Sequence, residues 1–245
     1  MIKIINSDVI EALNTIEDDT IDLLFIDPPY NLNKKYKGTS DFWNTEKDYL
    51  NWCYQWLELS INKLKKDGSL YFMCSTQFYA YFDIFIRERL HIKSRIIWEY
   101  DSSGVQAKKH FGSLYEPIIF AVKNKNKYTF NYQDILVETK TGAKRKLIDY
   151  RKSPPAPYND KKVPGNVWHF PRVRFKMEEY VEHPSQKPEI LLERIVKVSS
   201  NESSVVLDLF AGSFSLGRVC KRLNRNYIGI EKSAEYSKLG NLRLK

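Results

Sequence analysis

The segment Ile21–Tyr30, with the sequence IDLLFIDPPY, is the most informative stretch of this 245-residue chain. Its first six residues are almost all apolar, as in a strand buried within a sheet. Two prolines end the strand, and each restricts the residue before it, so Asp27 and Tyr30 project from a stiff loop. In a doubly wound sheet, ligands bind at the carboxyl ends of the strands. We therefore expect this loop to carry function.

Short strand-like segments alternate with longer amphipathic ones on both sides of this stretch, which predicts an α/β fold with a mostly parallel sheet flanked by helices. Seven strands are predicted: Ile2–Ile5, Ile21–Ile26, Ser69–Cys74, Arg95–Tyr100, Ile118–Val122, Val205–Phe210 and Tyr227–Ile230. Helices are predicted at Val9–Ile16, Glu46–Lys66, Phe78–Leu90, Glu189–Ser199, Leu216–Leu223 and Ala234–Leu244. The helix from Glu46 has a basic last turn at Lys65 and Lys66, with Gly68 just past its end.

Composition restricts the class of protein. A hydrophobic content of 42% with 14% aromatic residues is enough for a folded core and excludes disorder. The weakly charged stretch Ser69–Phe82 is too short to cross a bilayer, and the first ten residues do not resemble a secretion signal, so we expect a cytoplasmic protein. Cys53, Cys74 and Cys220 are far apart and are interpreted as buried small residues rather than disulfide or zinc ligands.

Positive charge is concentrated in one segment. Residues Thr139–Met177 hold eleven Lys or Arg and two Asp, which accounts for the whole formal net charge of +9. The same segment has five of the ten prolines and interleaves aromatic residues among the cations: Tyr150, Tyr158, Trp168, Phe170 and Phe175. This combination favours binding of a polyanion with stackable bases, and a solvated surface excursion is the alternative. We divide the chain into residues 1–123, a basic insert of residues 124–182, and residues 183–245, with the first and last parts forming one domain.

A glycine-bearing turn follows the strand that starts at Val205. The segment Asp208–Gly217, DLFAGSFSLG, lacks the lysine of a phosphate-binding P-loop, and Phe214 replaces the middle glycine of the dinucleotide fingerprint. Glu231 closes the next strand, nineteen residues after Gly212, where an acidic side chain holds ribose hydroxyls. The turn therefore predicts an adenosyl ligand without a pyrophosphate, and a nicotinamide-dependent oxidoreductase is the weaker alternative.

The loop after Ile26 suits alkylation of an exocyclic amine on an aromatic ring. The Asp27 carboxylate and the Pro28 carbonyl would each accept one N–H and favour the tetrahedral nitrogen of the transition state, while Tyr30 stacks on the base. An ordinary Pro-Pro turn with a surface Asp is the alternative.

These motifs resemble a known family. The sequence Asp27-Pro28-Pro29-Tyr30 is similar to the catalytic motif of amino-methyltransferases that use S-adenosylmethionine, which implies these four residues as catalytic. Its position ahead of the glycine turn, with the basic insert between, resembles the circularly permuted β class of DNA methyltransferases and implies their Rossmann-like fold. Asp208–Ser213 resembles that class's DPFxGSG motif, with departures at Leu209 and Phe214, and His183–Pro188 matches the motif HP[ST]QKP.

The resemblance also implies a set of cofactor contacts. Ser185 and Lys187 would hold the carboxylate of S-adenosylmethionine, Glu231 its ribose, and Asp8 its adenine. The full set of expected cofactor-binding residues is Asp8, Asp27, Ser185, Lys187, Asp208, Phe210, Ala211, Gly212, Ser213 and Glu231. No metal is expected, and His183 is interpreted as structural.

Three further segments narrow the resemblance. Asp101–His110, Leu147–Lys152 and Val163–Trp168 look like the corresponding parts of solitary bacterial adenine methyltransferases that modify ATGCAT. This implies methylation of N6 of a flipped-out adenine in duplex DNA, by an enzyme associated with the bacterial nucleoid. The expected DNA-binding residues are Lys34, Lys35, Lys144, Arg145, Arg151, Lys152, Arg172 and Arg174.

Several alternatives stay open at this point. Cytosine N4 is electronically similar to adenine N6, RNA is a further substrate, and a DNA-binding regulator without turnover would share the scaffold. The sequence leaves open whether the protein is a monomer or a homodimer, and whether a restriction enzyme accompanies it.

Overall fold

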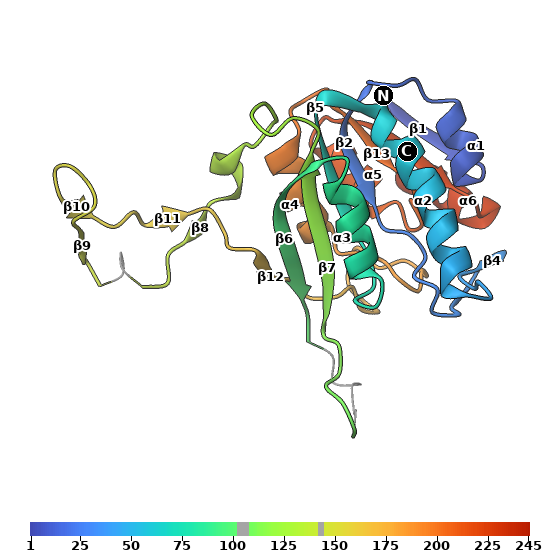
Figure 1. The fold of residues 1–245 in the computed structure, drawn as a ribbon, viewed down its shortest axis with the longest axis horizontal. Coiled ribbons are helices and arrows are strands. Elements are labelled where there is room, and N and C mark those ends of the chain that lie inside the picture. Colours follow the sequence, from blue (N-terminus) through green and yellow to red (C-terminus); the bar gives the residue numbers. More distant parts are fainter. Residues whose placement is uncertain (102–107, 142–144) are drawn as a thin grey trace.

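The computed structural model describes residues 1–101, 108–141 and 145–245 (Figure 1). The helices are α1 (Val9–Asn14), α2 (Glu46–Lys63), α3 (Tyr79–Arg87), the 3-10 helix η1 (Tyr132–Ile135), α4 (Glu189–Ser199), α5 (Ser215–Arg222) and α6 (Ala234–Arg243). The strands of the main sheet are β1 (Ile2–Asn6), β2 (Ile21–Ile26), β5 (Leu64–Met73), β6 (His91–Glu99), β7 (Tyr115–Val122), β12 (Val167–His169), β13 (Val205–Asp208) and β14 (Asn226–Glu231). The short strands are β3 (Lys35–Tyr36), β4 (Thr39–Ser40), β8 (Val137–Glu138), β9 (Ile148–Asp149), β10 (Ala156–Pro157) and β11 (Lys161–Lys162).

The main sheet is mostly parallel, as predicted. Its strand order is β1-β14-β13-β2-β5-β7-β6-β12, and neighbouring strands from β1 to β5 are parallel. Strand β7 runs antiparallel to both β5 and β6. Within the described ranges this sheet has eight strands rather than the predicted seven, because β12 of the basic insert pairs in parallel with β6.

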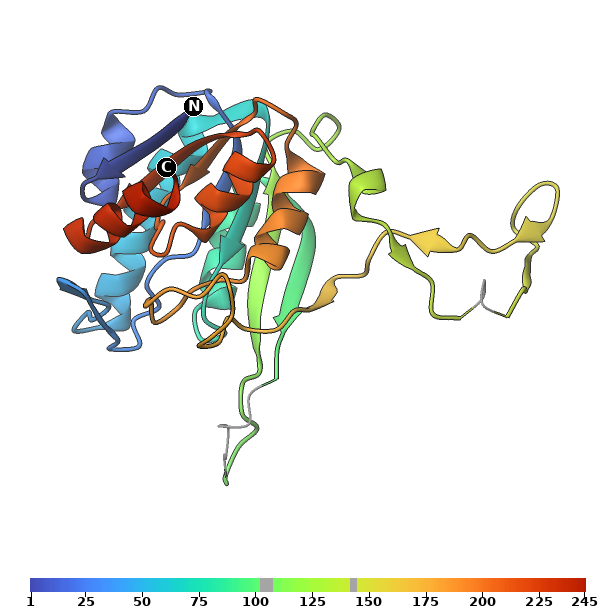
Figure 2. The same ribbon diagram turned by 180° about the vertical axis from the view of Figure 1, so that it is seen from behind.

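Helices cover both faces of the sheet. Helices α1, α2 and α3 lie on the face seen in Figure 1, and α4, α5 and α6 lie on the opposite face, seen in Figure 2. Each face has its own apolar core. One includes Trp56 of α2 and Phe82 of α3, and the other includes Leu191 of α4 and Val219 of α5. This arrangement explains why the central strands are apolar on both faces. In the part of the chain that the structure describes, no helix has both the length and the apolar character to cross a membrane.

The predicted end of the second helix is wrong. Helix α2 ends at Lys63, and Lys65, Lys66 and Gly68 belong to β5. The backbone becomes extended at Leu64, which pairs with Ile21 of β2. A Cβ on Gly68 would lie 3.0 Å from the carbonyl oxygens of Ile21 and Lys65, so this glycine serves close packing rather than a helix cap.

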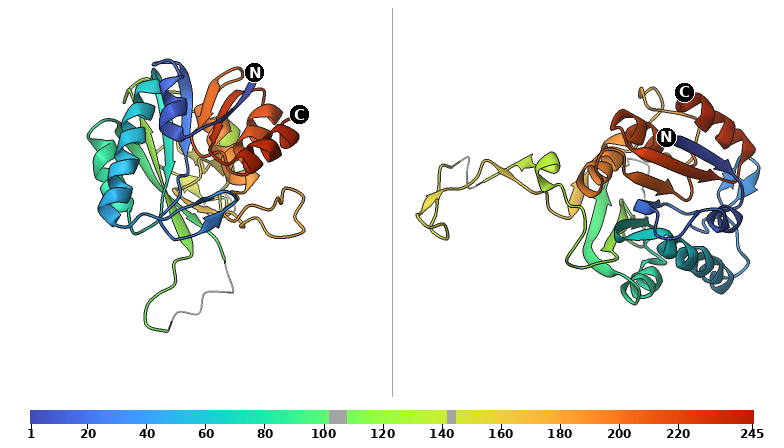
Figure 3. Two further views of the ribbon diagram at one scale, coloured as in Figure 1. Left: turned by 90° about the vertical axis from the view of Figure 1, so that its right-hand side faces the viewer. Right: turned by 90° about the horizontal axis from the view of Figure 1, so that it is seen from above.

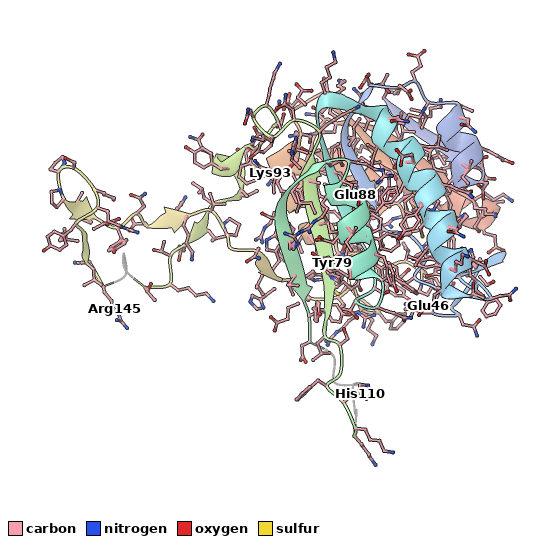
Figure 4. The ribbon with its side chains drawn as sticks, viewed as in Figure 1. Glu46, Tyr79, Glu88, Lys93, His110 and Arg145 are labelled. Atoms are coloured by element: carbon pink, nitrogen blue, oxygen red, sulfur yellow. The ribbon has the colours of Figure 1, made fainter. Side chains whose placement is uncertain are left out.

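Part of the basic insert forms an arm. Strand β8 pairs with β11, and β9 pairs with β10, in two antiparallel ladders of two residue pairs each. Figures 1 and 3 show this segment extending away from the helices and the sheet. Figure 4 shows Arg145 on the arm, and His110 on a separate loop that projects from the ends of β6 and β7.

Two aromatic residues of the insert are not available to stack on bases. Trp168 and Phe170 are buried in the core on the α4 side, where the Arg194 guanidinium lies 5.0 and 4.5 Å from their ring centroids. Trp168 belongs to β12 and Phe170 follows it directly, so these two rings pack in the core, contrary to the expectation that the aromatic residues of the segment stack on bases. Tyr150 and Phe175 remain exposed.

Candidate active site

The loop after β2 is held from two sides. The hydroxyl of Tyr49, on α2, donates a hydrogen bond of 2.8 Å to the carbonyl oxygen of Pro29. The fully buried carboxylate of Asp41 accepts backbone N–H groups of Leu32 and Lys34. These contacts fix the position of Asp27 at the carboxyl end of β2, between β13 and β5.

Four side chains meet beside this loop, and we call them the acid–lysine cluster: Asp27, Tyr30, Glu116 and Lys187. The Lys187 Nζ lies 2.6 Å from Asp27 Oδ2 and 3.5 Å from Glu116 Oε2. The Tyr30 hydroxyl lies 2.6 Å from Asp27 Oδ1 and 3.0 Å from Glu116 Oε2, so one phenol proton faces two carboxylates. The cluster joins the end of β2, the start of β7 and the segment before α4.

Burial and charge act in opposite directions on Lys187. Burial disfavours its ammonium form, but the neighbouring carboxylates of Asp27 and Glu116 outweigh this and raise the pKa of Lys187 above its usual value. Burial and the same two carboxylates raise the pKa of the Tyr30 phenol well above its ordinary value. Lys187 is therefore a cation and Tyr30 a neutral hydrogen-bond donor at neutral pH.

Sequence reasoning missed Glu116. It stands near the beginning of β7, where a polar residue is common. The one available signal was a carboxylate placed directly before Pro117 and an apolar run. Only the antiparallel pairing of β7 with β5 brings Glu116 to the carboxyl ends of the parallel strands.

The predicted cofactor residues line connected hollows beside Asp27. A cavity of about 350 Å³ is lined by Asp8, Asp27, Ser185, Phe210, Gly212 and Glu231, among others. A smaller recess shares four of these residues and adds the remaining members of the predicted set: Lys187, Asp208, Ala211 and Ser213. A cavity of this size suits a small-molecule ligand. The structure thus places all ten residues around one site.

The turn after β13 has the backbone geometry of a ligand cradle. Gly212 has a φ of +48°, and a Cβ there would lie 2.8 Å from His183 Nε2. Glu231 accepts N–H groups from Gly212 at 2.8 Å and Ser233 at 2.7 Å. Burial raises the pKa of the Glu231 carboxyl. Its oxygens keep lone pairs for hydroxyl groups of a ligand.

Asp208 has an unsatisfied oxygen in the smaller recess. Its Oδ2 accepts a hydrogen bond of 3.0 Å from the Tyr227 hydroxyl, and within the described residues its buried Oδ1 has no hydrogen-bond partner. Burial raises the pKa of this carboxyl to about 7. A buried acceptor without a partner fits a ligand that brings a donor, and the ammonium end of an adenosyl amino acid is such a donor.

Asp8 lies at the other end of the larger cavity. It is the N-cap of α1 and accepts the Ile10 N–H through Oδ1. Its second oxygen, Oδ2, is 3.2 Å from Lys232 Nζ. The N-cap role thus orients Asp8 independently of any ligand.

Phe214 stands at the end of the turn, where the motif that the turn resembles has a glycine. It adopts the left-handed conformation with a φ of 59°, and its ring is fully buried in the core on the α4 side. A left-handed backbone at this position explains why glycine stands here in the motif that the turn resembles. Phe214 in place of glycine thus adds a ring to the core on the α4 side, and this ring does not line the larger cavity.

His183 packs against the same turn. Its Nδ1 accepts the Ser185 N–H at 3.3 Å, and its ring meets the Tyr236 ring edge-on at 4.6 Å between centroids. Burial, with a contribution from Lys187, lowers the pKa of His183 to about 4. This imidazole is neutral at pH 7 and supports the positions of Ser185 and Gly212.

Four of the predicted DNA-binding residues lie in two places, on the arm and at the recess beside Asp27. Arg151 forms a bidentate ion pair with Asp149, and Lys152 bonds to Pro157 and Asn159, so both brace the arm itself. Arg172 lies over the Tyr100 ring and lines a recess shared with Lys34, Asp27 and Tyr30.

The four other members of that set lie on exposed segments or outside the described residues. Arg174 contacts the carbonyl oxygen of Asp101, and Arg145 is exposed. Lys144 and the side chain of Lys35 lie outside the described part of the chain, as does the middle of the Asp101–His110 segment.

Known proteins are similar to this chain in sequence and in fold. Residues 21–241 match the family described as DNA methylase. The chain is 52% identical to the DNA adenine methyltransferase YhdJ of Escherichia coli (strain K12), over 98% of this chain and 82% of that protein. It is 36% identical to the type II methyltransferase M.HpaI of Haemophilus parainfluenzae, over 99% of this chain and 74% of that protein.

Two solved structures have the same fold. The M1.HpyAVI–SAM complex aligns over all of both chains with a TM-score of 0.68 and 24% identity. The PvuII DNA methyltransferase (cytosine-N4-specific) aligns over all of this chain and 86% of its own, with a TM-score of 0.74 and 17% identity.

Proposed function

This chain belongs to the DNA methylase family, and on that premise we propose that it transfers a methyl group from S-adenosylmethionine to N6 of adenine in duplex DNA. The observation that carries the proposal is the position of Asp27 and Pro28 on the wall of the cavity that Gly212 and Glu231 also line. An amine-binding loop and an adenosyl-binding turn thus face one space. Bound S-adenosylmethionine supplies an electrophilic methyl group on a sulfonium.

The protein's own residues orient the target amine. Each Asp27 oxygen has one partner in the cluster and keeps a lone pair, so the carboxylate accepts one N–H of the amine. The Pro28 carbonyl accepts the other, and the Tyr30 ring stacks on the base. Preorganised acceptors of this kind favour a nitrogen that becomes tetrahedral and positive.

We propose a circularly permuted order of the methyltransferase fold. Strand β13, with the glycine turn, lies at the centre of the sheet, next to β2 with the Asp-Pro-Pro-Tyr loop. The strand late in the chain therefore occupies the place of a first Rossmann strand. The domain division at residues 124 and 183 belongs to this proposal.

The basic arm and the catalytic recess would bind the duplex together. Lys and Arg side chains of the insert would bind phosphates. Arg172 and Lys34 line a recess with Asp27 and Tyr30, so they would lie close to the flipped base. We propose ATGCAT as the recognised sequence, on the strength of the segments named above. The enzyme would then act at the nucleoid of a bacterial cell.

Single-molecule sequencing tests the proposal. DNA from a methylation-free host that expresses this protein is examined for N6-methyladenine and N4-methylcytosine in every sequence context. N6-methyladenine confined to one motif supports the proposal, and ATGCAT as that motif supports the specificity. Detection of N4-methylcytosine instead would show that cytosine, and not adenine, is the target base. Absence of both marks would favour RNA methylation or a DNA-binding protein without turnover.

A further inference from the structure

Glu116 is the one member of the acid–lysine cluster that has no role in the proposed function. Its side chain is largely buried, and Oε2 lies 3.0 Å from the Tyr30 hydroxyl and 3.5 Å from Lys187 Nζ. The recess that it lines also contains Asp27 and Pro28, the two residues assigned to the target amine. The contacts of Glu116 with Tyr30 and Lys187 thus connect it to Asp27 through two neighbours.

The cluster has an unusual charge balance for a buried site. Asp27 and Lys187 by themselves form a neutral pair at 2.6 Å. A neutral pair would exert only a weak electrostatic attraction on the nitrogen of the target amine, which becomes positive as its lone pair bonds to carbon. Glu116 adds a second carboxylate to the same ammonium, which leaves a formal charge of −1 on the four side chains.

We infer that Glu116 is a positioning residue that keeps the acid–lysine cluster around Asp27 negative, by sharing Lys187 with Asp27 and by holding the Tyr30 hydroxyl. This inference rests on the proposed function and concerns how Glu116 sets the charge beside Asp27 at that same site. Without Glu116, the ammonium of Lys187 would neutralise Asp27. With it, Asp27 stabilises the charge that develops on the target amine in a site shielded from water.

Three further charged residues, Lys34, Asp41 and Arg172, line the same recess. The Asp41 carboxylate accepts the backbone N–H groups of Leu32 and Lys34. The Arg172 guanidinium lies 5.0 Å from the centroid of the Tyr100 ring. Both line the recess, but the contacts that reach Asp27 within hydrogen-bond distance come from Tyr30 and Lys187.

Isosteric variants of the full-length protein test the inference. Glu116→Gln keeps the shape and removes the charge, whereas Glu116→Asp keeps the charge. The rate of methyl transfer is measured in a single turnover with saturating cofactor and duplex DNA, alongside the cofactor Kd and the Tm. We expect Glu116→Gln to lower the rate about 10²-fold with little change in Kd, and Glu116→Asp to lower it less. Glu99→Gln, an exposed carboxylate at the end of β6, is the matched control and should leave the rate unchanged.

A charge-restoring double variant gives the sharpest readout. Glu116→Gln with Lys187→Met returns the cluster to a formal charge of −1. Because Lys187 is also an expected cofactor-binding residue, the cofactor Kd of the double variant is measured first and its rate is taken at saturating cofactor, where it should exceed that of Glu116→Gln alone. A double variant no faster than Glu116→Gln at saturating cofactor would overturn the inference. So would a Glu116→Gln protein with an unchanged single-turnover rate, or one whose loss is matched by its loss of Tm and cofactor binding. Failure of the wild-type protein to methylate DNA would instead defeat the proposed function.

Discussion

The ring of Phe214 fills the space in which a side chain at Gly240 would stand. A Cβ built on Gly240 would lie 2.5 Å from two carbons of that ring. The left-handed backbone of Phe214 destabilises the fold by roughly 1–2 kcal/mol, as for any L-residue. Packing of its buried ring against α6 offsets this cost. The glycine in α6 and the phenylalanine in the turn are thus two parts of one packing arrangement.

Gly240→Ala is therefore expected to destabilise the wild-type protein by about 1–3 kcal/mol, because the added methyl group collides with the ring. In a Phe214→Gly background the same substitution should stabilise by about 1 kcal/mol, since alanine is the better helix former. Urea unfolding of the four proteins measures both effects. Equal effects of Gly240→Ala in the two backgrounds would show that the two residues do not interact.

Asp27→Ala is expected to abolish detectable methylation, or to reduce it by about 10²–10⁴-fold, while cofactor binding persists. The reason is that the acceptor of the target amine is lost while the glycine turn is intact. Radiolabelled methyl incorporation and calorimetric titration of the cofactor measure the two properties. Asp18→Ala, which removes an exposed partner of Lys63, is the control. Substantial residual activity would count against Asp27 as the main acceptor.

Gly212→Ala should weaken cofactor binding and lower the Tm. The new Cβ would stand 2.8 Å from His183 Nε2, at a φ of +48° that L-residues rarely adopt. Gly165→Ala is a matched control, because a Cβ there meets nothing within 4 Å. Thermal melting with and without cofactor compares the two proteins. Similar behaviour of both would remove the argument that the turn needs glycine.

Asp208 should contribute a stability that is lost as the pH rises. Its pKa is about 7 in the folded protein against 3.8 for an unperturbed carboxyl, so the folded state binds more protons between these values. This contribution to the free energy of unfolding is up to about 4 kcal/mol. It is fully present below about pH 4 and is lost as the pH rises to about 7.

Asp208→Asn removes this dependence, so the variant should gain stability relative to wild type as the pH rises from 5 to 8. His183, with a pKa of about 4, acts in the opposite direction and is present in both proteins, so the difference between their unfolding free energies isolates Asp208. A difference that does not change with pH would contradict the assignment.

Replacement of residues 137–162 by a short Gly/Ser linker should preserve the fold and cofactor binding but abolish site-specific methylation. Val137 and Lys162 are paired across β8 and β11, so the two ends of the arm are adjacent and easily joined. Tm, cofactor Kd and methylation of a duplex measure the three properties. Retained methylation at the same motif would show that the arm does not recognise DNA.

Local sequence was sufficient for the elements with strong patterns. The bounds of β2 and α4 were predicted to the residue, because a pair of prolines ends the first and a clear apolar face with Pro188 before it defines the second. The strand β12 was not predicted, since three residues have too little pattern and its pairing with β6 depends on the edge of the sheet. The end of α2 was missed because two basic residues such as Lys65 and Lys66 are typical of the last turn of a helix, whereas here they lie at the start of β5.

Three motifs in the sequence by themselves indicate a DNA methylase, the family to which the chain belongs: a stiff Asp-Pro-Pro-Tyr loop, a glycine turn with a downstream glutamate, and a basic insert. Each is contiguous or regularly spaced, so its physical meaning is local. The tertiary structure alone decided that Glu116 joins Asp27 and Lys187, that Phe214 points into the core, and that Trp168 belongs to the sheet. These relationships join residues far apart in the chain, and they arise only when strand pairing and packing bring them together.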